Sequence, residues 1–75
     1  MARQKVPTDT REKNAWIKYQ LDLAGCSFAK IAREGNVSRT VVRRALAIKY
    51  PKWEGVIAKK IGYTPAEIWP ERYAA

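Results

Sequence analysis

Residues 27–46 read SFAKIAREGNVSRTVVRRAL, and this stretch decides how the rest of the chain is interpreted. Ser27 and Ser38 are natural N-caps, because a serine hydroxyl accepts a hydrogen bond from a free amide of the first helical turn. Between them lie Gly35 and Asn36, which tolerate a positive φ angle, Gly for lack of a Cβ and Asn through local hydrogen bonding. The stretch therefore predicts a short helix, a tight turn and a second helix.

The second of these helices, over residues 38–49 with its serine cap, separates into two faces at 100° per residue. One face is basic and polar and contains Arg39, Thr40, Arg43, Arg44 and Ala47. The other is apolar and contains Val41, Val42, Ala45, Leu46 and Ile48. We expect the apolar face to be buried and the basic face to be exposed.

Two helices joined by such a turn form a helix-turn-helix when the crossing point is small and the anchors are apolar. Ala32 supplies the small residue, and Asn36 stands in the turn where Gly is commoner. The apolar anchors are Ile31, Val37, Val42 and Ala45. A basic outer face on the second helix favours this interpretation, since that face meets the phosphate-lined major groove.

The rest of the chain predicts only helices, with no β-alternation and no internal repeat. Asp9 and Glu12 have capping-box spacing, and Thr64, Pro65 and Glu67 form a second start signal. We expect helices over 10–24, 28–34, 39–49 and 51–61, and a short turn of helix that begins at residue 65 and does not extend far past Pro70. The predicted fold is a compact all-α bundle of about five helices over residues 9–75, preceded by a flexible basic arm over residues 1–8.

Composition excludes several kinds of protein. Seventy-five residues make a single domain. With one cysteine and no histidine, the chain can form neither an internal disulfide nor a zinc site of the Cys/His type. The acidic residues fall at capping or exposed positions, so no carboxylate cluster for a metal or for acid-base catalysis is expected. We therefore expect no enzyme, no cofactor and no small-molecule substrate, and we assign Trp16, Trp53 and Trp69 to core packing.

The net charge of +8 is concentrated in one part of the chain. Residues 27–53 contain seven basic side chains and one acidic side chain, whereas the basic and acidic residues of 54–75 cancel. Such an excess favours a polyanionic partner. No segment is long and apolar enough to span a bilayer and no export signal is visible, so we expect a cytoplasmic protein associated with the nucleoid through DNA.

The segment YPKWEGVIAKKIGYTPAEIWPERY, residues 50–73, carries a more specific signal. Its Tyr-Pro-Lys start and its Ile-Trp-Pro-x-Arg-Tyr ending resemble the Ner family of phage Mu and related transposable phages, including bacterial Ner-like regulators. The resemblance covers residues 10–75. It implies an all-helical domain similar to lambda-repressor heads, and a repressor of early phage genes that acts on inverted half-sites.

Two departures from the family pattern affect what the resemblance can predict. Family turns often have an aromatic residue followed by Gly, whereas this turn has Gly35 and Asn36. The second helix is also more basic than that of the phage Mu protein. The operator sequence is therefore not transferred.

These observations predict a transcriptional regulator that reads double-stranded DNA, with residues 38–49 in the major groove. Arg39 and Arg43 are expected to reach base edges, and Thr40 a base or a thymine methyl. The expected backbone contacts come from Ser27, Lys30, Ser38 and Arg44. We expect a homodimer on DNA, and the state of the free protein is left open.

Alternative interpretations remain at this point. The arginines of residues 38–49 could form a solvated face, and Arg3 and Lys5 could belong either to a disordered tail or to an arm that touches DNA. An architectural or excisionase-like protein that bends DNA would have the same charge. A binder of single strands or RNA is less favoured, because residues 38–49 contain no aromatic side chain for base stacking.

Overall fold

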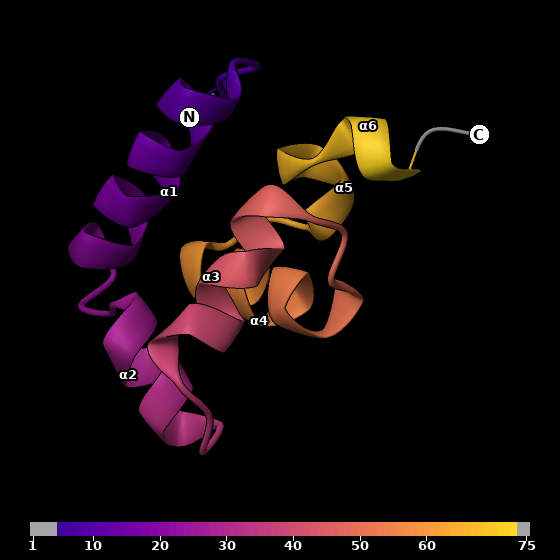
Figure 1. Ribbon diagram of the computed structural model, residues 1–75. Helices are drawn as coiled ribbons and strands as arrows, with labels where there is room; N and C mark the ends of the chain where they lie inside the picture. Colours follow the sequence, from indigo (N-terminus) through magenta and orange to yellow (C-terminus); the bar gives the residue numbers. More distant parts are fainter. Residues whose placement is uncertain (1–4, 74–75) are drawn as a thin grey trace.

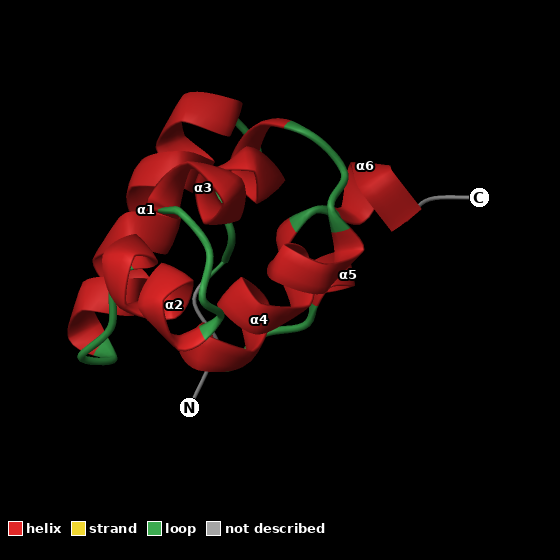
Figure 2. Cartoon of the chain, turned by 60° about the horizontal axis from the view of Figure 1, so that its bottom comes forward, coloured by secondary structure: helices red, strands yellow, loops and turns green. Residues whose placement is uncertain are grey.

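The computed structural model describes residues 5–73, which form six helices and no strand (Figures 1 and 2). The four longer helices are α1 (Thr10–Leu23), α2 (Phe28–Glu34), α3 (Arg39–Ala47) and α4 (Pro51–Ile61). Two four-residue helices follow, α5 (Pro65–Ile68) and α6 (Pro70–Tyr73). The prediction of a compact all-α bundle is confirmed. Past Pro70 the chain forms one more helical turn.

Serine, threonine and aspartate side chains begin four of the helices, as predicted. The Asp9 carboxylate accepts the amide of Glu12 at 3.1 Å, and the Ser27 hydroxyl accepts that of Lys30 at 3.1 Å. Ser38 caps α3 by accepting the amide of Val41 at 3.4 Å, and Thr64 and Glu67 form a reciprocal capping box at α5. These local bonds satisfy amides that have no partner inside the helix.

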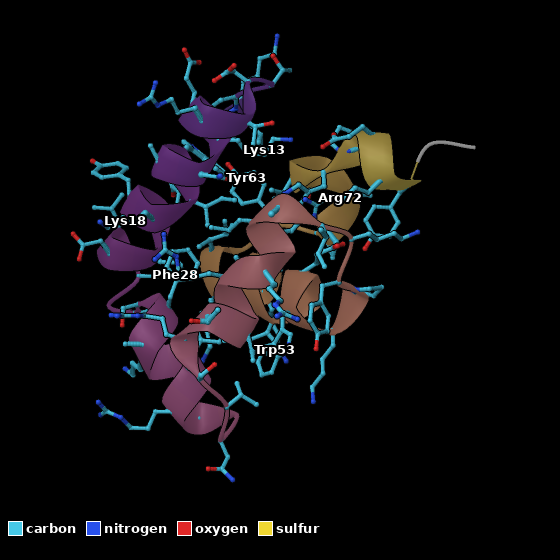
Figure 3. All side chains as sticks on the ribbon, viewed as in Figure 1. Lys13, Lys18, Phe28, Trp53, Tyr63 and Arg72 are labelled. Carbon is cyan, nitrogen blue, oxygen red and sulfur yellow. The ribbon has the colours of Figure 1, made fainter. Side chains whose placement is uncertain are left out.

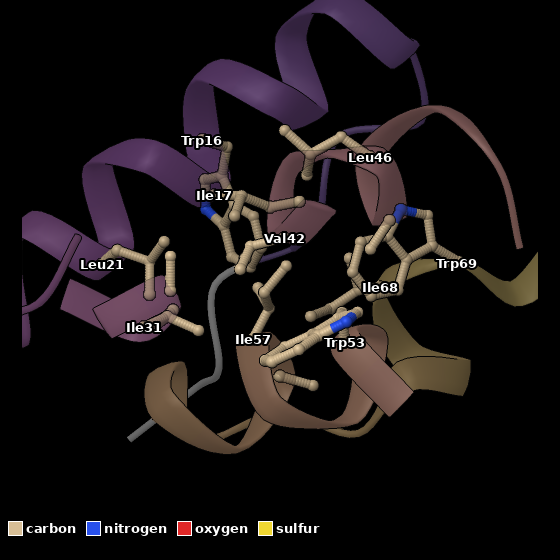
Figure 4. Close-up of a cluster of buried hydrophobic side chains, with 13 residues drawn as sticks. Trp16, Ile17, Leu21, Ile31, Val42, Leu46, Trp53, Ile57, Ile68 and Trp69 are labelled. Carbon is tan, nitrogen blue, oxygen red and sulfur yellow. The ribbon is translucent and has the colours of Figure 1, made fainter. Parts of the chain in front are cut away.

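All the longer helices contribute to one hydrophobic core (Figure 4). Its members are Trp16, Ile17, Leu21, Ile31, Ala32, Val42, Ala45, Leu46, Trp53, Ile57, Ala58, Ile68 and Trp69. The three tryptophans are therefore packing residues, which confirms their assignment from the sequence. Trp16 also meets Tyr63 edge-on, with ring centroids 5.1 Å apart, so that α1 is held against the loop between α4 and α5.

Helix α3 is shorter than the sequence predicted, and its apolar face ends earlier. The chain leaves the helix after Ala47, and Ile48 is extended, with φ −132° and ψ 162°. Its side chain is 54% exposed, so the expectation that Ile48 is buried was wrong. Ala24, which the first helix was expected to turn inward, is exposed as well.

Three of the four longer helices end in the same way. A left-handed residue, Gly25, Asn36 or Gly62, stands after α1, α2 or α4, with φ of 72°, 56° and 79°. The next residue then donates its amide to a carbonyl five positions back, at 2.8 to 2.9 Å, in the three pairs Cys26 to Leu21, Val37 to Ala32 and Tyr63 to Ala58. This arrangement satisfies carbonyls that a helix end otherwise exposes. Helix α3 lacks it, because Ile48 is extended.

Two charged side chains are buried, and one of them, Glu54, is acidic, whereas the acidic residues were expected at capping or exposed positions. Glu54 on α4 is fully buried, and Lys13 on α1 is 4% exposed. Each has an ion-pair partner on α6: Arg72 lies 3.1 Å from Glu54, and Glu71 lies 3.3 Å from Lys13. Such partners are what allow charges to remain inside a protein.

Part of the predicted N-terminal arm, residues 1–4 with Arg3, lies outside the described residues. The remainder, residues 5–8, is not helical. Val6 in this segment packs against the core.

Candidate nucleic-acid interface

The outward face of α3 carries the predicted arginines. Arg39, Thr40, Arg43 and Arg44 are all exposed. On the other side of the same helix, Val42 and Ala45 have no exposed surface. The buried side therefore fixes the rotation of α3 about its axis, and helical periodicity places the basic side chains toward solvent.

A shallow groove lies where α1, α2 and α3 meet. Its lining residues are Lys18, Ser27, Phe28, Ala29, Arg39 and Arg43. Three predicted site residues, Ser27, Arg39 and Arg43, are thus brought to one surface by the turn between α2 and α3. Figure 3 shows Lys18 on α1 above Phe28 at the start of α2.

Lys18 is the residue that sequence reasoning missed. It lies on α1, nine residues before the start of segment 27–46, and its local sequence resembles that of any exposed helical lysine. Only the folded arrangement of the helices brings it to the same groove as Arg39 and Arg43. No signal in the sequence indicates that proximity.

The remaining predicted residues lie at helix starts or on the exposed surface. Ser27 and Ser38 use an oxygen lone pair for capping, so each hydroxyl hydrogen stays available for donation to an oxygen ligand. Lys30 is exposed, and its Nζ donates to the carbonyl of Gly25 at 3.4 Å. Arg44 lies one helical position beyond Arg43, outside the set that lines the groove.

The positive charge of α3 is not neutralised by neighbouring carboxylates. Within residues 5–73, the ion pairs join Lys13 to Glu71, Lys60 to Glu34 and Arg72 to Glu54, and none includes an arginine of α3. A hydrogen bond from Lys60 to Glu34, together with the charge of Glu34, raises the pKa of Lys60. Lys60 on α4 and Arg72 on α6 thus have acidic partners, whereas the arginines of α3 face solvent and attract anions.

Residues 5–73 contain neither a membrane span nor a cluster of metal ligands. No helix there has the length and apolar character needed to cross a bilayer. No three side chains among the Cys, Asp and Glu residues of that part gather as metal ligands.

Comparison with known proteins identifies the family. The sequence profile of a family described as winged helix-turn-helix DNA-binding matches residues 13–75. The chain is 43% identical over 57 residues to the negative regulator of transcription of Escherichia phage D108, which covers 76% of this chain and 78% of the relative. It is 37% identical over 71 residues to the Mu-like prophage FluMu DNA-binding protein Ner of Haemophilus influenzae. This match covers 91% of this chain and 80% of the relative. The chain belongs to the Ner family of helix-turn-helix DNA-binding proteins.

A bacterial relative of this Ner-family chain is the sugar fermentation stimulation protein B of Escherichia coli K12. It is 41% identical over 49 residues, which are 65% of this chain and 53% of the relative. No solved structure matches the chain. The family membership confirms both the resemblance drawn from residues 50–73 and the prediction of a DNA-binding protein rather than an enzyme.

The description of the family as winged is not reflected in residues 5–73. A wing is a β-hairpin, and the described part of this Ner-family chain contains only helices, turns and loops (Figure 2). DNA contacts in this part must therefore come from the helices and the loops between them.

Proposed function

We propose that this Ner-family protein represses transcription, by binding a specific double-stranded DNA site with α3 in the major groove. One observation carries the proposal: the groove between α1, α2 and α3 combines Arg39 and Arg43, which have no carboxylate partner within residues 5–73, with Lys18 and Ser27. The names of the phage and prophage relatives support repression and DNA binding.

The arginines at the exposed N-terminal half of α3 would read bases. Arg39 and Arg43 are four residues apart, so their side chains lie one turn apart on one edge of the helix. An arginine donates two parallel hydrogen bonds to O6 and N7 of guanine, which is the commonest specific contact in the major groove. Thr40 lies beside them and offers a methyl and a hydroxyl to a neighbouring base.

Other side chains would hold the DNA backbone. Ser27 and Ser38 stand at the N-termini of α2 and α3, whose free amides attract phosphate oxygens. Lys30, Arg44 and Lys18 add positive charge around the same groove and its edge. Such contacts set the register of the protein on the duplex without reading sequence.

Two copies would bind one operator. Symmetric DNA is read by a symmetric pair, with half-sites about 34 Å or one helical turn apart. Free copies repel each other because each has a net charge of +8, and phosphates remove that repulsion on DNA. We therefore propose a homodimer that forms on the operator, and a location on the nucleoid that follows from DNA binding.

The test compares two duplexes of equal length, one selected by the wild-type protein from a randomised pool and one scrambled. Arg39→Ala and Arg43→Ala should each cost about 1–3 kcal/mol on the selected duplex and much less on the scrambled one. Lys59→Ala is the matched control, since Lys59 is an exposed basic residue on α4. If both arginine variants lose affinity equally on the two duplexes, these residues only hold phosphates and the proposed recognition is wrong.

A further inference from the structure

A residue far away in the sequence donates hydrogen bonds to the C-terminal end of α3. The Arg72 guanidinium, on α6, donates through Nη1 to the carbonyl of Ala45 at 2.6 Å and through Nη2 to the carbonyl of Leu46 at 3.2 Å. These two carbonyls belong to the last turn of α3, where no following helical amide can reach them. In Figure 3 Arg72 lies beside the end of α3.

The guanidinium of Arg72 also contacts Glu54 and Trp69. Nη1 also donates to Oε2 of Glu54 at 3.1 Å, and the Glu54 side chain has no exposed surface. Glu54 accepts two more hydrogen bonds, from the amide of Tyr50 and from the phenol of Tyr73. The plane of Arg72 also lies over the ring of Trp69, with its Cζ 5.1 Å from the ring centroid. Hydrogen bonds, an ion pair and a ring contact thus hold the Arg72 side chain, which is 13% exposed.

The contact of Arg72 with α3 takes the place of the local C-terminal motif that ends the other long helices. Helices α1, α2 and α4 end in a left-handed residue and a closing amide, whereas α3 ends in the extended Ile48. One local bond remains at that end, from the amide of Ile48 to the carbonyl of Arg44 at 3.0 Å. A nine-residue helix is too short to be stable alone, so α3 relies on tertiary contacts, and those of Arg72 lie at its last carbonyls.

We propose that Arg72 is a positioning residue for DNA reading: it fixes the last turn of α3, which contains Arg44 and directly follows Arg43, and thereby the course of the helix that carries both arginines. The inference rests on the proposed role of α3 in the major groove. A bidentate contact to a base needs a fixed backbone, because two hydrogen bonds must align together. A phosphate contact tolerates a mobile side chain. Loss of Arg72 should therefore reduce discrimination between duplexes more than it reduces binding to all DNA.

Four variants separate positioning from stability. Arg72→Ala removes all the contacts of the guanidinium, and Arg72→Lys keeps a positive charge beside Glu54 but cannot bond two carbonyls in fork geometry. Lys13→Met and Glu71→Gln are the matched controls, because the Lys13–Glu71 pair, 3.3 Å long, ties the same α6 to α1 and does not touch α3. Each variant is measured on the selected and the scrambled duplex at a temperature where it is folded.

We expect Arg72→Ala to lower the ratio of the two affinities at least fivefold, Arg72→Lys to lower it less, and both controls to leave it unchanged even where they lower the melting temperature. Amide hydrogen exchange gives a second readout that does not involve DNA. Ala47 and Ile48 should exchange faster in both Arg72 variants, while the amides of α1 keep the wild-type rate.

An unchanged affinity ratio in a folded Arg72→Ala protein would overturn the proposal. If Arg72→Ala does not fold, Arg72→Lys is the deciding variant. Wild-type values for both the affinity ratio and the exchange rates of Ala47 and Ile48 in Arg72→Lys would then overturn the proposal. A wild-type protein with no preference for any duplex would instead disprove the proposed function. In that case the exchange rates alone still show whether Arg72 fixes the end of α3.

Discussion

Gly35, at the end of α2, lies directly against the indole ring of Trp53 on α4: a Cβ placed on Gly35 would stand 2.5 Å from Cη2 and 3.2 Å from Cζ3. Trp53 is 3% exposed and belongs to the core, so a shift of its ring would disturb the side chains packed against it. The close approach brings the turn of the helix-turn-helix onto α4. Because φ at Gly35 is −90°, sterics and not backbone conformation require glycine there.

We expect Gly35→Ala to destabilise the fold by about 1–3 kcal/mol, the usual cost of overpacking a filled core. Gly55 is the matched control, since it lies within α4 and a Cβ there would meet nothing within 4 Å. Gly55→Ala should stabilise the protein by about 0.5–1 kcal/mol through helix propensity. Urea unfolding of both variants measures the two free energies, and a neutral Gly35→Ala would show that Trp53 can move.

Substitutions at Asn36 test the left-handed conformation of the turn between α2 and α3. Its φ of 56° is left-handed, where alanine is strained and glycine is not. Asn36→Ala should cost about 1 kcal/mol of folding free energy, and Asn36→Gly should be neutral or slightly stabilising. Thermal unfolding of the pair checks the difference, and equal melting temperatures would contradict the left-handed turn.

The buried carboxylate of Glu54 predicts a dependence of stability on pH. Burial raises the pKa of Glu54, but hydrogen bonds from Tyr73, from the Tyr50 amide and from Arg72 outweigh it, so that the pKa is lowered on balance. The folded state then binds fewer protons than the unfolded state. The resulting stability is present above about pH 4.3, the ordinary pKa of a glutamate, and is lost as the pH falls through the lowered value.

Glu54→Gln should accordingly be less stable than wild type at pH 7, and the difference should shrink as the pH is lowered toward 3. Melting temperatures of the two proteins over this range measure it. A difference that stays constant with pH would mean that the ionised form of Glu54 contributes nothing to the fold.

Salt should weaken DNA binding steeply. If about five to seven phosphates are neutralised per subunit, log K plotted against log salt should fall with a slope of about −0.9 per contact. Lys18→Ala should reduce the slope by about one contact, because Lys18 lines the groove with Arg39 and Arg43. Lys60→Ala is the control, since Lys60 is paired with Glu34 at 3.1 Å. A slope near zero would contradict DNA binding, and an unchanged slope in Lys18→Ala would remove Lys18 from the interface.

The features that could be predicted from the sequence are those with local causes. The caps at Ser27 and Ser38 depend on an amide three residues away, and the outward position of Arg39 and Arg43 depends on helical periodicity alone. The left-handed turn at Asn36 likewise follows from residue type.

The features that were missed depend on residues that meet only in the folded chain. Arg72 and Glu54 are 18 positions apart, and Arg72 and Ala45 are 27 apart. Glu54 on its own has the pattern of an ordinary acidic residue in the first turn of a helix, so its burial could not be predicted. Ile48 was misplaced because the apolar periodicity continues through it, whereas the helix ends at Ala47 and the backbone of Ile48 is extended.

The burial of Trp16, Trp53 and Trp69 has an optical consequence. All the indole fluorescence of the chain arises inside the core, since these are its three tryptophans and they are 8%, 3% and 1% exposed. None lines the groove between α1, α2 and α3. Emission should therefore shift to longer wavelength when water reaches the rings on unfolding, and should keep its maximum when a duplex binds. The three tryptophans thus report whether a variant is folded, with or without DNA, so that a loss of affinity can be distinguished from unfolding in the same sample.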